Sequence, residues 1–77
     1  MTRDAVNIHK GDTIHVTPHD VWRGDAHPLH TRIDATVRVT GTDHVGSVVV
    51  ICWRTATSCG AVVYDWDAPV ELIAGAA

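Results

Sequence analysis

The sequence predicts a single all-β domain, and its length, composition and residue alternation all support this. The chain has 77 residues, enough for one small hydrophobic core. Valine, isoleucine, threonine, tryptophan and tyrosine make up 30 of these residues, whereas Leu, Glu, Lys, Gln and Met make up only 5. β-Branched and aromatic residues favour strands, and unbranched ones favour helices. A helical bundle, a coiled coil and a βαβ unit are therefore excluded as the main architecture.

The alternation of apolar and polar residues predicts five strands, at residues 12–17, 33–40, 47–54, 60–67 and 70–73. The third strand is apolar on both faces and forms a hairpin with the fourth across a loop at 55–58. Residues 41–46 are expected to form a turn cluster because they include two glycines and an aspartate. The expected organisation is an N-terminal arm at 1–11, a barrel at 12–73 and a frayed tail at 74–77.

Residues 18–32 form a long polar segment between the first and second predicted strands. The segment shows neither strand nor helix periodicity. A structureless loop of this length is uncommon in a small domain and is often functional. Trp22 is expected either to plug one end of the barrel or to contact a partner, and Arg23 beside it suits the second role.

Five strands with a long first loop, a tight hairpin and a proline before the last strand resemble the SH3-like small β-barrel. The resemblance is carried by Gly11-Asp12 before the first strand, Val49–Trp53 in the third and Pro69–Ile73 at the end. In these features the chain is similar to small SH3-like proteins of actinobacteria and their phages. The resemblance implies a five-stranded SH3-like barrel with a long loop between strands 1 and 2. It also implies a phage accessory protein or a structural component of a particle.

The Ala-Leu-Tyr-Asp-Tyr motif of eukaryotic SH3 domains is absent after the first predicted strand. Recognition of proline-rich peptides is therefore not implied by the resemblance.

The 55–58 loop predicts the pairing of the third and fourth strands, with Arg54 opposite Cys59 and Ile51 opposite Val62. One face of this hairpin is then expected to form the core, with Val49, Ile51, Trp53, Val62, Tyr64 and Trp66. Further core residues are expected on the other strands: Ile14, Val16, Ile33, Val37, Val39 and Leu72.

The second face of the hairpin carries Val48, Val50, Cys52, Ala61 and Val63. Because a small barrel has only one interior, this face is expected to be an exposed valine patch. Such a patch usually marks an interface, here with a second copy of the chain or with another protein. The alternative is that the N-terminal arm folds over the patch and covers it with Ala5, Val6 and Ile8.

The histidines suggest a metal-responsive or pH-responsive loop as a further hypothesis. His27 and His30 lie three residues apart, and His19 precedes them in the same segment. Imidazole is a zinc ligand, but this spacing is not that of a zinc finger and no Cys-x2-Cys pair accompanies it. A solvated polar loop is the simpler interpretation, and no cofactor is expected.

The charge distribution disfavours nucleic acid as a partner. The net charge is −3, and the arginines are widely spaced and interleaved with acidic residues. A nucleic-acid-binding barrel is kept as the alternative because Arg38, Arg54 and Trp22 could form a small stacking site. Catalytic motifs are absent, so we expect a non-enzymatic module that contacts proteins, as a homo-oligomer or within a larger assembly.

The sequence shows no apolar segment of membrane-spanning length, and no signal peptide is expected because the first seven residues lack an apolar stretch. A cytoplasmic location is expected, or a virion if the protein is encoded by a phage. Cys52 and Cys59 are then expected to be free thiols rather than a disulfide.

Overall fold

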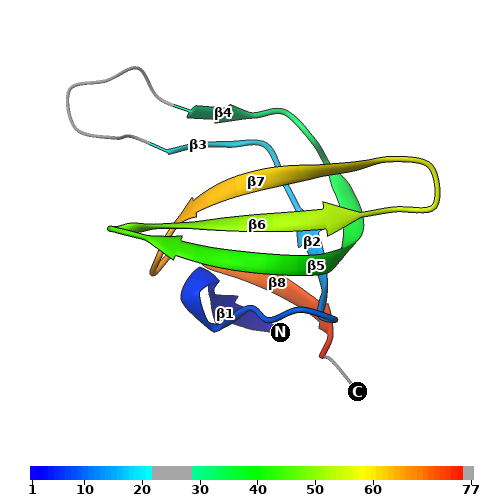
Figure 1. Cartoon of the computed structure of the whole chain (residues 1–77), viewed down its shortest axis with the longest axis horizontal. Coiled ribbons are helices and arrows are strands. Elements are labelled where there is room, and N and C mark those ends of the chain that lie inside the picture. The colour runs from blue at the N-terminus through cyan, green and yellow to red at the C-terminus, as the bar shows by residue number, and fades with distance from the viewer. Residues whose placement is uncertain (22–28, 76–77) are drawn as a thin grey trace.

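The computed structural model describes residues 1–21 and 29–75 and confirms an all-β fold (Figure 1). The elements, in chain order, are β1 (Thr2–Asp4), the short 3-10 helix η1 (Ala5–Asn7), β2 (Thr13–Val16), β3 (His19–Val21), β4 (Leu29–Thr31), β5 (Ala35–Val45), β6 (Val48–Arg54), β7 (Cys59–Asp65) and β8 (Pro69–Ala74). Within the described residues, no helix is long and apolar enough to cross a membrane.

The main sheet contains six strands in the order β1-β8-β2-β5-β6-β7, and all their pairings are antiparallel. The long strand β5 connects two parts of this sheet. Its first part pairs with β2 and its second part with β6, and the register shifts between Val39 and Gly41. An irregularity of this kind bends a strand, which lets the sheet curl around one core.

The sheet differs from the expected five strands because the N-terminal arm adds a sixth. Thr2, Arg3 and Asp4 pair with Glu71, Val70 and Pro69 of β8. The arm also contributes to the core, since Ala5 and Ile8 are buried in the same cluster as Val49 and Ile51. The arm therefore closes the core face of the β6–β7 hairpin and does not cover the opposite face.

The predicted turn cluster at 41–46 is wrong in extent. Strand β5 continues to Val45, and only Gly46 and Ser47 form the turn before β6. Gly46 has a φ of +61°, a conformation that suits glycine. Residues 41–45 show no clear alternation of apolar and polar side chains, because both faces of this part of the strand are largely exposed.

The segment predicted as a structureless loop at 18–32 contains strands β3 and β4, which form a separate two-stranded sheet. His19 pairs with Thr31, and Asp20 with His30. Both strands contact β7, and Figure 1 shows the two strands running along one end of β7.

The core prediction is confirmed for most residues. The buried cluster includes Val49, Ile51, Val62 and Tyr64 from the β6–β7 hairpin, with Trp53 packed against it. Trp66 is the exception, because it is 48% exposed. Strand β7 ends at Asp65, so Trp66 lies in the following turn and no longer follows the strand alternation.

Candidate functional site

The predicted β6–β7 pairing is confirmed, but the second face of this hairpin is not an exposed valine patch. Val48 is only 3% exposed. Val50 and Val63 are half-buried, and Cys52 and Ala61 are exposed. The hairpin β3–β4, expected to be an open loop, lies against β7, and its Val21 is buried as well. The exposed side chains of this face are thus its small ones, and its valines are buried or half-buried.

The outer edge of β7 is the most distinctive feature of this region, and its hydrogen-bond register can be worked out. Trp66 N donates to Ser47 O, and Thr55 N donates to Ser58 O, at the two ends of the β6–β7 ladder. Hydrogen-bonded pairs alternate along an antiparallel ladder, so Gly60, Val62 and Tyr64 direct their backbone groups toward β6. The backbone groups of the alternate residues Cys59, Ala61 and Val63 therefore point away from the sheet.

In the described part of the chain, no strand pairs with β7 on this outer side. The carbonyl of Val63 is engaged, because it accepts a hydrogen bond from His19 Nε2 at 2.9 Å. Residues Cys59, Gly60 and Ala61 are exposed. The N–H and C=O groups of Cys59 and Ala61 thus form a short open strand edge.

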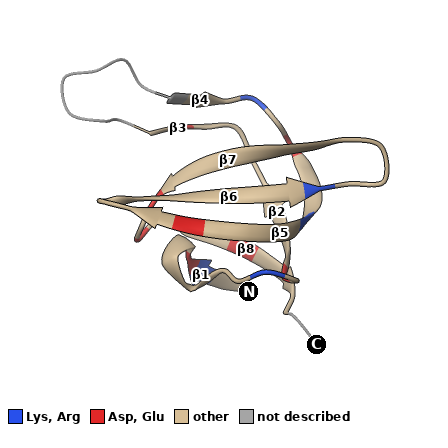
Figure 2. Ribbon diagram, in the orientation of Figure 1, with Lys and Arg blue, Asp and Glu red and all other residues tan. Residues whose placement is uncertain are grey.

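This edge is small and uncharged. Residues 59–64 contain no charged side chain, and Figure 2 shows acidic and basic residues interleaved elsewhere on the ribbon. Gly60 is required by its neighbour, since a Cβ atom there would lie 2.8 Å from Cζ2 of Trp53. The indole ring therefore packs directly across the backbone of Gly60.

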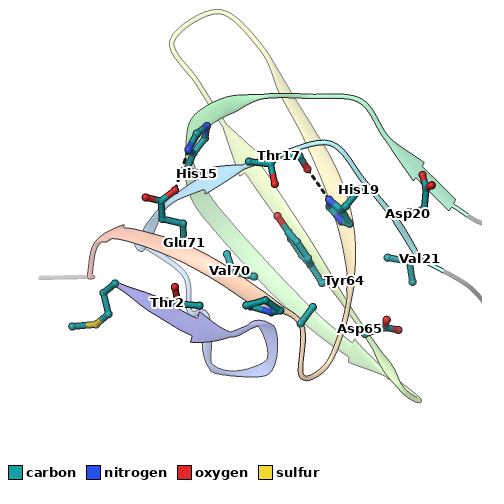
Figure 3. A pocket seen from close by; sticks show the side chains of 13 residues that line it. Thr2, His15, Thr17, His19, Asp20, Val21, Tyr64, Asp65, Val70 and Glu71 are labelled. Atoms are coloured by element: carbon teal, nitrogen blue, oxygen red, sulfur yellow. Dashed lines mark hydrogen bonds and ion pairs between the residues drawn. The ribbon is translucent and has the colours of Figure 1, made fainter.

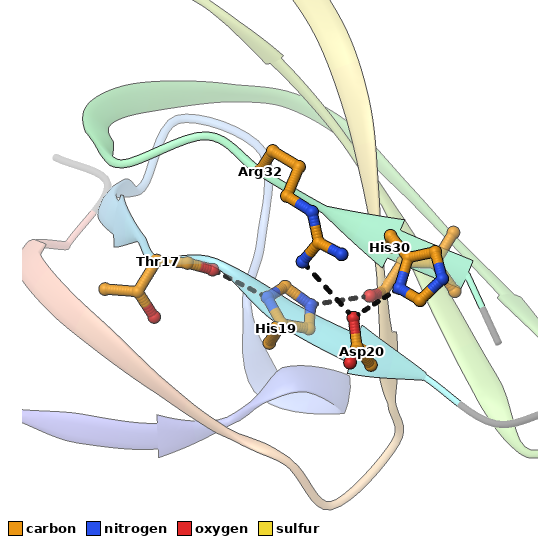
Figure 4. Close-up of polar contacts among 6 residues, drawn as sticks. Thr17, His19, Asp20, His30 and Arg32 are labelled. Atoms are coloured by element: carbon orange, nitrogen blue, oxygen red, sulfur yellow. Dashed lines mark hydrogen bonds and ion pairs between the residues drawn. The ribbon is translucent and has the colours of Figure 1, made fainter.

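His19 attaches the β3–β4 hairpin to β7 (Figure 4). Its Nδ1 lies 2.7 Å from the carbonyl oxygen of Thr17, and its Nε2 lies 2.9 Å from that of Val63. The ring also stacks on Tyr64, with centroids 4.4 Å apart and planes 10° from parallel. Both oxygens are acceptors, so a neutral ring satisfies one of them and a protonated ring satisfies both.

A pocket of about 490 Å³ opens beside this contact, between β8, β2 and the start of the hairpin (Figure 3). His15, His19 and Tyr64 line it together with Asp20, Asp65 and Glu71. His15 is held by Asp34 at 2.7 Å and by Glu71 at 3.1 Å, one at each ring nitrogen. Both histidine rings thus have a protein oxygen at each nitrogen, so their ring nitrogens are engaged within the protein.

The ionisable groups of this region are tuned by their hydrogen bonds and by burial. The hydrogen bonds to Asp34 and then Glu71 raise the pKa of His15. The hydrogen bond from His30, with a smaller contribution from Arg32, lowers the pKa of Asp20. Burial raises the pKa of Tyr64 to about 12, so its phenol is neutral at physiological pH.

The predicted metal ligands are only partly described. His30 hydrogen-bonds Asp20 at 2.6 Å, and His19 makes the contacts given above. His27, together with Trp22 and Arg23, lies outside the described residues. Within residues 1–21 and 29–75, no three His, Cys, Asp or Glu side chains converge to hold a metal ion.

The two arginines considered for nucleic-acid binding are brought together. Arg38 and Arg54 are directly opposite each other on β5 and β6, and both are exposed. Cys59 lies opposite Arg54 on the other side, and both Cys52 and Cys59 are free and exposed. Like charges at opposite positions destabilise a sheet, so this pair would gain from a bound anion.

Sequence reasoning missed the open edge and the pocket. The edge had one visible signal, Gly60 inside an otherwise apolar strand, because such a glycine often marks a close approach of another backbone. The pocket had none, since His15, Tyr64 and Glu71 are far apart in the chain.

Comparison of the chain with protein-family models, with curated protein sequences and with solved structures finds no significant match.

Proposed function

We propose that this chain is a non-enzymatic protein-binding module that accepts an extended protein segment along the outer edge of β7. The supporting observation is the set of outward N–H and C=O groups on Cys59 and Ala61, exposed and unpaired within the described residues. Unpaired strand edges bind a further strand readily, because main-chain hydrogen bonds supply affinity without a deep pocket.

The side chains around this edge suit such a partner. Ala61 and Cys59 are small, so a second backbone can come close. The half-buried Val50 and Val63 lie on the same face and offer apolar contact to alternate side chains of the added strand. A segment that is neutral and rich in β-branched residues would match this surface best.

We further propose that the bent sheet is an SH3-like small barrel. Its support is that β8, the last strand, returns to pair with β2, and that the segment after β2 is long. As a barrel of the actinobacterial and phage type, the module would dock on a larger assembly such as a phage particle.

The experiment is a binding selection from an array of extended peptides with three versions of the protein. Ala61→Pro removes the outward N–H but leaves the ladder to β6 intact, and Ala61→Ser keeps the N–H as the matched control. Peptides that bind the wild type and Ala61→Ser but not Ala61→Pro support the proposal. If no peptide binds at protein concentrations where the chain is monomeric, or if bound peptides tolerate Ala61→Pro, the β7 edge does not bind peptides.

The opposed arginines favour one second candidate, the binding of nucleic-acid phosphate. Bidentate contacts from Arg38 and Arg54 would relieve their mutual repulsion. Retention on a single-stranded nucleic-acid column that falls with salt and is lost in Arg54→Ser would support it. Elution in the flow-through at low salt would dismiss it.

A further inference from the structure

We infer that the segment seated on the β7 edge is β7 of a second copy of this chain, antiparallel, with Gly60 opposite Gly60 of the second copy. This inference rests on the proposed function and names its partner. The result is a two-fold symmetric dimer with a sheet that continues from β6 and β7 of one copy to β7 and β6 of the other.

The register follows from which backbone groups are free. With Gly60 opposite itself, Cys59 of each copy faces Ala61 of the other, and these residues are the ones whose outward groups are open. The two Cys59–Ala61 pairs then form hydrogen-bonded pairs of an antiparallel ladder, in which each pair exchanges both N–H···O bonds.

A register shifted by one pairing step is less suitable. Centring the two-fold axis on Ala61 would place Cys59 opposite Val63, whose carbonyl already accepts the His19 hydrogen bond. In the chosen register only Thr57 of the 55–58 loop comes opposite Val63, so no ladder hydrogen bond to that carbonyl is needed. The His19 contact thus limits the open edge to Cys59–Ala61.

The chosen register also brings small, uncharged residues together at the two-fold axis. Gly60 faces Gly60, so no side chain stands between the two backbones at the axis. Ser58 comes opposite Val62 and Thr57 opposite Val63, and residues 57–63 carry no charge. Two copies of a charged segment would bring like charges together in a symmetric pairing, and this uncharged segment does not.

The two edge strands of the main sheet, β1 and β7, differ in how well their edges are protected against pairing, and only β7 is open to a partner strand. Strand β1 has three residues and carries Arg3 and Asp4, which are common protections of an exposed edge. Strand β7 has seven residues, and none of its first six is charged or a proline. The part of this edge that His19 leaves open, Cys59–Ala61, has no such protection, and a closed two-fold pairing covers it without growth into a fibre.

The first experiment measures mass against concentration by light scattering for the wild type, Ala61→Pro and Ala61→Ser. We expect a monomer–dimer equilibrium in the wild type and in Ala61→Ser. Ala61→Pro should weaken dimerisation by about tenfold or more, which corresponds to about 1.4 kcal/mol or more. Far-ultraviolet circular dichroism checks that the proline variant is folded, and amide exchange at Cys59 and Ala61 should slow as the wild type dimerises.

The second experiment tests the register by cross-linking with the thiol oxidant diamide. In a Cys52→Ser background, Ala61→Cys places a new thiol opposite Cys59 of the second copy, at a Cα separation of about 5.5 Å. That separation lies within the range of a disulfide, so a covalent dimer should form rapidly. Thr57→Cys in the same background is the matched control and should cross-link slowly, because it lies opposite Val63.

The outcomes separate this inference from the proposed function. A wild type that stays monomeric, or a dimer that tolerates Ala61→Pro, overturns the inference. Rapid cross-linking in the control but not in Ala61→Cys also overturns it, because the register would be different. Peptide binding that is lost in Ala61→Pro, by a protein that stays monomeric, would leave the proposed function standing without the dimer.

Discussion

Gly60 and Trp53 show how a single residue controls the edge strand. The Trp53 ring packs across Gly60, and its Nε1 is buried without a hydrogen-bond partner in the described part of the chain. The ring is therefore held by packing rather than by a polar contact. Any side chain at residue 60 must displace it.

Gly60→Ala should destabilise the fold by about 1–3 kcal/mol, because the added methyl group overlaps the indole ring. Gly41→Ala is the matched control, since nothing lies within 4 Å of a Cβ atom built at that position. Urea denaturation followed by tryptophan fluorescence measures both. Equal stabilities for the two variants would contradict the packing argument.

The protonation of His15 is coupled to stability through its two carboxylate partners. Its hydrogen bonds to Asp34 and Glu71 raise its pKa above the ordinary value of 6.5. A raised pKa in the folded state means that the protonated form stabilises the fold. This contribution is complete below pH 6.5 and is lost as the pH rises through the raised pKa.

His15→Thr should therefore lower the stability below pH 6.5 and have a smaller effect above the raised pKa of His15. The exposed His44 provides the control, as His44→Thr. Urea denaturation of the three proteins between pH 5 and pH 9 gives the difference at each pH. A difference that stays constant, or grows with pH, would show that the two carboxylates do not stabilise a protonated ring.

At the scale of elements, the side chain of His19 supplies the polar contact between the β3–β4 hairpin and β7. His19 makes the side-chain hydrogen bond from the hairpin to β7 and stacks on Tyr64. The hairpin is otherwise a separate two-stranded sheet, and an isolated two-stranded sheet is marginally stable in water. We therefore expect the backbone hydrogen bonds of the hairpin to open more often when the His19 contact is lost.

His19→Phe keeps an aromatic ring over Tyr64 but removes both hydrogen bonds. We expect faster amide exchange in β3 and β4, with little change in the global stability, because the main core is untouched. The freed carbonyl of Val63 would lengthen the open edge of β7. Hydrogen exchange read by NMR measures this, and unchanged exchange in the hairpin would show that other contacts hold it.

At the scale of the whole molecule, the N-terminal segment completes the core. Ala5 and Ile8 are almost fully buried, and Val6 N donates to the carbonyl of Trp66. A short chain buries a smaller fraction of its surface than a long one, so each large side chain in the core matters for stability. The first eight residues are therefore part of the folding unit.

Ile8→Ala should destabilise the protein by about 2–4 kcal/mol, as expected for a fully buried isoleucine. Ile73→Ala is the matched control, because Ile73 is 52% exposed. Thermal and urea denaturation measure both variants. A loss for Ile8→Ala no larger than that for Ile73→Ala would show that the N-terminal segment is dispensable.

Local patterns predicted the strands well and their environment less well. The predicted pairs Arg54–Cys59 and Ile51–Val62 are confirmed, because a four-residue loop leaves the hairpin one register. The sixth strand was missed because Thr2–Asp4 has no alternation of its own. It is a strand only because β8 offers it a partner.

The sequence by itself determined the all-β class, the hairpin register and the core face, since these follow from alternation and loop length over neighbouring residues. Only the tertiary structure decided what lies on the other face. Val48 is buried, and the open surface is the backbone edge at Cys59–Ala61. Exposure of a strand edge depends on which distant strand pairs with it, and the side-chain pattern along one strand does not identify that partner.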